Sequence, residues 1–353
     1  MRHRSAQPFT TALMLATALA SNHANAQSNV TIYGAVDAGL LWQNNAGPGQ
    51  STTSILNGGT APSILGFRGA EDLGGGLKAV FNLEAHLYAD TGQADARLFR
   101  RQSNVGFASE AFGTVLIGNQ YSPALLAYAS TDPRSAKEAF SGLYSWAYNS
   151  GALTTGNNTN NDVGVFIQNA ISYTRKFGAA GVAVGYSVSE QRGAVRSVGL
   201  TWTDALLLSA TLQQTNAPNS ARRQSSLYSA GVGYAWGAFT AKANFLRGVN
   251  DNVGGIETSK VNVAAAGLAW QSSASNTVAG SVYFGKDRNR GQDKTTTFIL
   301  ADEYALSKRT VVYAQAVYAR ARDQATLLTS VVGGGTQPGE NTSLLNLGLR
   351  HSF

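Results

Sequence analysis

The chain has 353 residues, of which 13% are charged, with 39 glycines, 14 tyrosines, 14 phenylalanines and no cysteine. A soluble domain usually carries about 25% charged residues, so this composition disfavours an ordinary soluble fold, and stabilisation by disulfides is excluded. The formal net charge of +7 is too small and too dispersed along the chain to indicate nucleic acid as a partner.

The first 26 residues have the pattern of a secretory signal peptide. A start with two arginines is followed by an uncharged stretch rich in Ala, Leu and Thr from residue 9 to residue 20, and Ala24-Asn25-Ala26 supplies the small-x-small cleavage pattern. Cleavage there leaves residues 27–353, with 25 basic against 20 acidic residues and no run of about eighteen apolar residues that could form a transmembrane helix. We therefore expect an exported protein that is either soluble or a β-barrel.

Period-two alternation begins almost with the mature chain and predicts β-strands. From Leu77 to Leu87, apolar residues alternate with polar ones that include Lys78, Glu84 and His86, so one face could meet lipid and the other water. An even number of strands, most with the ~9–11 residues that cross a membrane when tilted, predicts one all-β, antiparallel transmembrane β-barrel over residues 27–353. Sixteen segments show the pattern: 30–43, 61–71, 76–89, 97–108, 113–120, 166–177, 180–190, 193–203, 206–216, 224–235, 238–248, 259–271, 275–286, 293–305, 309–321 and 342–353.

The links between these segments tend to alternate in length. Short turns such as Gly178-Ala179 alternate with longer polar links such as 44–60 and 322–341, although the link at Gln191-Arg192 is an exception. Short periplasmic turns and long external loops are the asymmetry expected of an outer-membrane barrel.

The longest link covers residues 121–165 and follows the fifth predicted strand, so it would be the third external loop. A link of this length is unusual in a compact fold and is generally functional or disordered. Five aromatic residues argue for packing against another part of the molecule rather than for a solvated tail: Tyr128, Phe140, Tyr144, Trp146 and Tyr148.

Several stretches give the chain a resemblance to the general diffusion porins of Gram-negative bacteria, in particular the trimeric beta-proteobacterial type, over essentially its whole mature length. They are residues 30–34 (VTIYG) with Asp37, 66–79 (GFRGAEDLGGGLKA), 112–118 (FGTVLIG), 306–310 (LSKRT) and 348–353 (GLRHSF). The resemblance implies an outer-membrane homotrimer of sixteen-stranded barrels, with the long third loop folded into the lumen. It also implies passive diffusion of small hydrophilic solutes and ions, and contact with outer-membrane lipid and lipopolysaccharide.

The resemblance further implies basic side chains on the pore wall opposite acidic side chains on the third loop. Alternation independently groups Lys78 with Glu84 and His86, and at Arg100-Arg101 period two lets only one side chain point inward. The candidate wall residues are Arg68, Lys78, Glu84, His86, Arg100 and Arg101, and the candidate residues of the constriction loop are Asp132, Arg134, Lys137 and Glu138. The alternative is that the wall residues are merely solvated charges and that the loop residues form an exposed turn.

Two arginines that are common in such porins are missing from this chain. Ile64 stands in the first of these positions, within Ser63-Ile64-Leu65-Gly66, and Asn119 stands in the second, within Gly118-Asn119-Gln120. The strong anion preference of some relatives is therefore not carried over, and we expect a weakly anion-preferring channel.

An enzyme is not indicated. The mature histidines are His86 and His351, neither has a motif for a nucleophile or metal partner, and the glycine runs at 74–76 and 333–335 lack the lysine of a phosphate loop. No catalytic residue, cofactor or metal is therefore expected. Two alternatives to a general channel stay open, namely a substrate-specific outer-membrane channel and, less favoured, a soluble exported β-rich binding protein.

Overall fold

The computed structural model describes most of the mature chain. The described residues are 29–137, 141, 165–188, 193–251, 255–289, 294–323, 325, 337 and 339–353. The predicted signal peptide at 1–26, Glu138 and most of the second half of the predicted constriction loop lie outside them.

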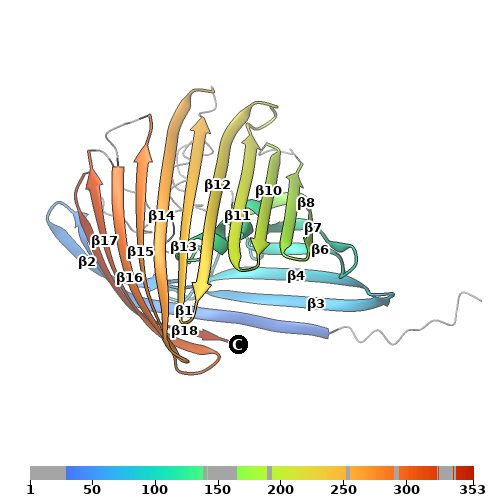
Figure 1. Cartoon of the computed structure of the whole chain (residues 1–353), viewed down its shortest axis with the longest axis horizontal. Helices are drawn as coiled ribbons and strands as arrows, with labels where there is room; N and C mark the ends of the chain where they lie inside the picture. The colour runs from blue at the N-terminus through green and yellow to red at the C-terminus, as the bar shows by residue number, and fades with distance from the viewer. Residues whose placement is uncertain are drawn as a thin grey trace, which may run out of the picture.

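Sixteen antiparallel strands close into a barrel (Figure 1). Strand β1 pairs with both β3 and β18, and the remaining strands pair in chain order, so these sixteen strands form a closed ring. At the seam, Gly34 and Phe353 exchange backbone hydrogen bonds of 3.1 and 3.0 Å. The strands are β1 (Asn29–Gly47), β3 (Ile64–Gly74), β4 (Leu77–Tyr88), β6 (Gln102–Ser109), β7 (Gly113–Tyr121), β8 (Phe166–Phe177), β9 (Ala180–Ser187), β10 (Val195–Thr203), β11 (Leu206–Asn216), β12 (Arg223–Trp236), β13 (Phe239–Asp251), β14 (Glu257–Ser273), β15 (Asn276–Asp287), β16 (Lys294–Ala305), β17 (Thr310–Arg322) and β18 (Thr342–Ser352).

The predicted barrel of sixteen strands is confirmed, with two differences in the links. Strand β2 (Gln50–Asn57) forms a hairpin with β1 inside the predicted link 44–60, and the two-residue β5 (Gln93–Ala94) pairs with the end of β4. Strand β6 begins at Gln102 rather than at residue 97 because Arg97 to Arg101 form a turn, in which Arg100 N–H donates to the Arg97 carbonyl at 3.0 Å.

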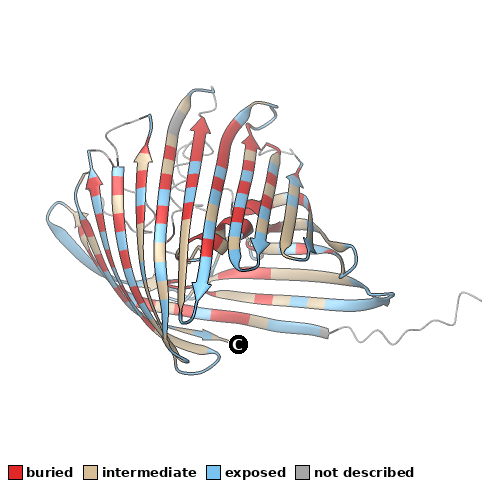
Figure 2. Cartoon of the chain, in the orientation of Figure 1, coloured by how far each residue is buried: buried red, intermediate tan, exposed pale blue. Residues whose placement is uncertain are grey.

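The wall of the barrel has two chemically different faces. In β17, Tyr313, Gln315 and Val317 are buried, whereas the alternate residues Ala316 and Tyr318 are exposed. This banding recurs on neighbouring strands (Figure 2). The outward face carries large exposed apolar residues such as Leu347, which is 62% exposed. Such a surface is stable in lipid and costly in water.

The connection from β2 to β3 folds onto the inward face of the wall and is held by Asp37. This fully buried carboxylate accepts hydrogen bonds from the backbone N–H groups of Gly59, Thr60 and Ala61 at 2.8–3.1 Å and from the Tyr313 hydroxyl at 2.6 Å. The donors satisfy a charge that would otherwise be costly to bury. This arrangement explains why β3 begins at Ile64 rather than at residue 61.

Candidate constriction inside the barrel

The helix α2 (Pro123–Thr131) begins directly after β7 and packs on the inward face of the wall. The Ser122 hydroxyl caps it by accepting a hydrogen bond from Leu125 N–H at 3.1 Å, and Pro123 occupies the first turn, where its missing N–H costs nothing. Among the described residues, no helix is long and apolar enough to cross a membrane.

We call Ser122 to Lys137 the belt, because this segment crosses the wall from strand to strand. In the first half of the belt, the Ala124 N–H donates a hydrogen bond of 3.0 Å to the Ser197 hydroxyl of β10. Thr131 then reaches the Ser209 hydroxyl of β11 at 2.6 Å and the Asn244 amide of β13 at 2.8 Å.

The second half of the belt continues across β15 and β16. Arg134 N–H donates to the Tyr283 hydroxyl of β15 at 3.2 Å, and the Lys137 ammonium forms an ion pair with the Glu303 carboxylate of β16. The belt therefore follows the β10–β16 side of the barrel, and the strands β3 and β4 face it across the interior.

Small residues on the wall let the belt approach closely. A Cβ atom at Gly199 would collide with the Pro123 carbonyl, and one at Gly231 would collide with the Thr131 side chain. Glycine at these strand positions thus serves backbone packing, which is a known reason for glycine inside a strand.

Asp132 fixes the turn that follows α2. Its carboxylate is fully buried and accepts hydrogen bonds from the Tyr128 and Tyr283 hydroxyls at 2.9 and 3.1 Å and from Arg134 and Ala136 N–H at 3.1 and 2.8 Å. Burial raises the pKa of Asp132, and the donors oppose the shift. Burial likewise lowers the pKa of Lys137, against the opposing effect of Glu303.

We expect Asp132→Asn to flatten the pH dependence of thermal stability. Because the pKa of Asp132 is raised in the folded state, the folded protein binds this proton more tightly than the unfolded chain. The stabilising contribution is full below the ordinary value near 3.8 and is lost as pH rises through the folded pKa. The melting temperature of the wild type minus that of the variant, measured from below pH 3.8 upward, should therefore decrease as pH rises. A difference that does not change with pH would contradict this prediction.

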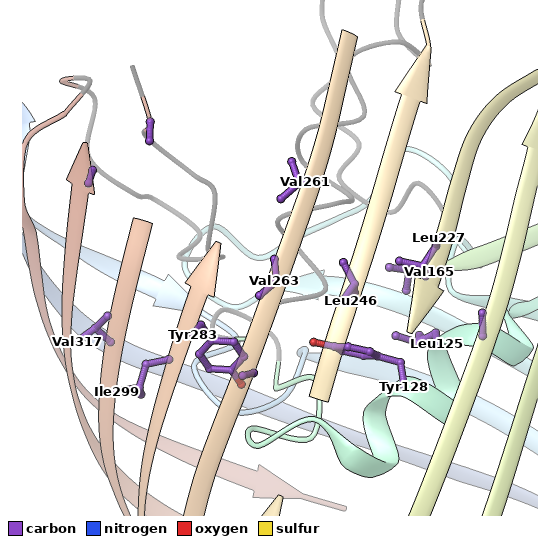
Figure 3. Close-up of a cluster of buried hydrophobic side chains, with 14 of the residues drawn as sticks. Leu125, Tyr128, Val165, Leu227, Leu246, Val261, Val263, Tyr283, Ile299 and Val317 are labelled. Atoms are coloured by element: carbon purple, nitrogen blue, oxygen red, sulfur yellow. The ribbon is translucent and has the colours of Figure 1, made fainter. Parts of the chain in front are cut away.

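Apolar side chains beneath the belt add to its anchoring. Leu125 and Tyr128 of α2 belong to one buried cluster with inward residues of the wall such as Leu227, Leu246 and Val263 (Figure 3). Each fully buried side chain of this size contributes roughly 1.5–3 kcal/mol. The belt is therefore packed against the wall and does not lie free in the interior.

Arg101 connects the two strands between which the long loop of residues 122–165 begins and ends. Its Nε atom lies 2.8 Å from the Glu84 carboxylate, its guanidinium donates to the Tyr121 hydroxyl, and its Cζ atom lies 5.3 Å from the centre of the Phe166 ring. Tyr121 ends β7 and Phe166 begins β8, so Arg101 ties together the two strands that flank the long loop. Arg101 and Glu84 are both at most 5% exposed, and we regard them as a structural pair.

The remaining predicted wall residues occupy different surroundings. Arg68 is exposed on the inward face of β3, with its guanidinium 5.0 Å from the Tyr33 ring, and lines a cavity of about 500 Å³. Lys78 is also exposed but lies near the short-turn end of β4, six residues from Glu84. Arg100 pairs with Asp95 at 3.1 Å, and His86 is buried with its Nε2 3.4 Å from the Asn57 amide.

Arg134 and Asp132 are buried, so the exposed-turn alternative does not describe them: Arg134 is 3% exposed.

The sequence analysis did not identify three further charged residues of the wall. Lys242, Glu303 and Arg350 lie on the inward face of β13, β16 and β18. Period-two counting from the exposed apolar residues of each strand would have placed them inward.

The inward charges are unequally neutralised. Among the described residues Arg68 and Lys242 form no ion pair, and the Arg350 guanidinium contacts the Thr60 hydroxyl at 3.4 Å. The acids Glu84 and Glu303, in contrast, are paired with Arg101 and Lys137. Among the described residues, Arg68, Lys242 and Arg350 are therefore inward cations without an ion pair, whereas the inward acids that form no ion pair, such as Asp37 and Asp132, are buried and hydrogen-bonded.

Comparison with known proteins gives a consistent result. A family model described as Gram-negative porin matches residues 10–324. Outer membrane porin protein 32 of Delftia acidovorans is 32% identical over 365 residues, which cover 97% of this chain and 99% of the relative. A solved anion-selective porin from Comamonas acidovorans superposes with a TM-score of 0.82 at 26% identity, covering 93% of this chain and all of that one. A trimer form of OmpT from Vibrio cholerae, at 15% identity, has a TM-score of 0.67 and covers 92% of this chain and 99% of that one.

Proposed function

The chain belongs to the Gram-negative porin family, and from this premise we propose that it is a general diffusion channel, with weak anion preference, whose lumen is narrowed by the belt. The protein is an outer-membrane porin and not an enzyme. The observation that carries the proposal is the belt itself, which is packed across the inward face from β10 to β16. A sixteen-stranded barrel is wide enough to leave an aqueous channel beside it.

Liposome swelling with neutral sugars of increasing size tests general diffusion. Entry rates should fall smoothly with solute size and should not saturate with concentration, because passive diffusion through a water-filled channel needs no solute-specific site. Rapid, saturable entry of one sugar would favour the substrate-specific channel instead.

The anion preference is supported by the inward charges. Within the described part of the chain, Arg68, Lys242 and Arg350 form no ion pair, whereas Glu84 and Glu303 are neutralised by neighbours. Fixed charges in a narrow, low-dielectric passage bias which ions enter. The preference is weak because Ile64 and Asn119 replace two basic residues expected in related porins.

We further propose that the protein is a homotrimer. Support comes from the family and from the trimer form in which one structural neighbour was solved. Unboiled samples in mild detergent should migrate on a gel as a species about three times the mass of the boiled chain, because boiling should dissociate the trimer. Migration as a monomer under every mild extraction condition would contradict the trimer.

A further inference from the structure

A row of basic residues runs across the outward face of five neighbouring strands. The strand register places Arg247 of β13 beside Asn262 of β14, then Lys286 of β15, Lys294 of β16 and Arg322 of β17. Four of these five positions are cationic. We call these five residues the basic row.

The basic row has no internal counter-charge. Within the described part of the chain, none of its four cations forms an ion pair. Lys286, Lys294 and Arg322 stand directly opposite one another on adjacent strands, an arrangement that destabilises a sheet through like-charge repulsion. The nearby acid Glu257 is already paired with Lys260 at 2.8 Å. An external anion would therefore relieve the repulsion.

The basic row borders the lipid-facing band. Phe245 and Phe284 lie two residues nearer mid-barrel than Arg247 and Lys286 on the same outward face, and both are more than 40% exposed. The positions in register with them are Ala264, Thr296 and Arg320, and the aromatic pair Phe298 and Tyr318 lies two residues nearer mid-barrel on the same outward face. The row lies at the strand ends that carry the long links, which is the external end of an outer-membrane barrel.

We propose that the basic row binds the phosphate groups of the phosphorylated glycolipid that forms the outer leaflet. The acyl chains would lie on the apolar band directly beneath it. A row that spans five strands at ~4.8 Å spacing is about 20 Å long, which suits a headgroup with several phosphates better than one small ion. Lysine and arginine are the residues that recognise anionic lipid headgroups at a membrane surface. The inference rests on the outer-membrane setting of the proposed function.

The test compares two triple variants of the mature chain, refolded without lipid. K286Q/K294Q/R322Q removes three cations of the basic row, and K176Q/K308Q/R309Q removes three exposed cations at the short-turn end. Binding to fluorescent bisphosphorylated lipid A is measured in detergent, with dephosphorylated lipid A and inorganic phosphate as further probes. Lys294→Gln alone serves as a milder variant if the triple variant folds poorly.

The basic-row triple variant should bind bisphosphorylated lipid A about a hundredfold more weakly, given roughly 1 kcal/mol for each of the three basic residues removed from an anionic surface. The control variant should bind like the wild type, and dephosphorylated lipid A should bind the wild type weakly. Equal binding by wild type and row variant would overturn the proposal. Complete competition by millimolar inorganic phosphate would also overturn it, because it would indicate a site for soluble anions. Conductance of the same variants is measured separately. A protein that binds no lipid but conducts ions would contradict only the lipid-binding proposal, whereas a protein that does not conduct would contradict the proposed channel function.

Discussion

Deletion of residues 123–155 is expected to raise single-channel conductance roughly twofold or more, because the section of a pore limits what passes through it. The deletion removes most of the belt, including α2 and the turn held by Asp132, while all sixteen strands of the barrel lie outside it. The uncovered wall positions include the small or polar Gly199, Ser209 and Gly231, which tolerate water, and the apolar Leu227, Leu246 and Val263, whose exposure should lower the stability of the variant. The measurement is conductance in planar bilayers.

The matched control for this deletion shortens a different long link. Removal of residues 327–336, between β17 and β18, should leave conductance close to that of the wild type, since this link is not part of the belt. Heat-dependent migration on a gel shows whether each variant has assembled. An unchanged conductance in an assembled 123–155 deletion would show that the belt does not set the narrow section.

Introduction of a cation by Ile64→Arg is expected to strengthen the anion preference markedly. Ile64 lies opposite His86 in the register of β3 and β4, on the inward face and two residues from Gly66, with Arg68 two residues further along. A new guanidinium there would add to the unpaired charge of Arg68 in the half of the barrel that faces the belt. The zero-current potential in a potassium chloride gradient should shift toward the chloride potential.

The control for this variant is Ile64→Gln, which is polar but neutral. Its zero-current potential should remain that of the wild type. The shift produced by Ile64→Arg should decrease as salt rises, because the screening length falls from about 30 Å at 0.01 M to about 10 Å at 0.1 M. Absence of any shift would mean that Ile64 does not line the ion path.

Much of the fold could be predicted because each barrel strand is exposed to two different solvents. The alternation around Lys78, Glu84 and His86, and the terminal alternation that ends at Phe353, follow directly from lipid on one side and water on the other. Strand β2 was not predicted. Its residues Gln50 to Asn57 are mostly exposed or half-buried, so they carry no alternation of buried and exposed positions.

The candidate site could be predicted only in part, because period two gives the face of a residue but not its partner. The alternation places Glu84 on the inward face, but it does not show that Arg101, which lies in the turn before β6, neutralises the Glu84 carboxylate. Asp132 was expected as a loop charge facing the pore wall, and its burial depends on Tyr283, which is 151 residues away in the chain. Contacts at such separations arise from the closure of the barrel, which local sequence patterns do not encode.

The zero-current potential of the wild-type channel in a potassium chloride gradient tests the account most directly. The inward cations Arg68, Lys242 and Arg350 form no ion pair with any residue that the structure describes, and the inward acids Glu84 and Glu303 are paired. This arrangement predicts a modest potential of the sign that indicates chloride preference. This potential should approach zero as salt is raised, since screening weakens the fixed charges. A potential that indicates clear preference for potassium would contradict the account.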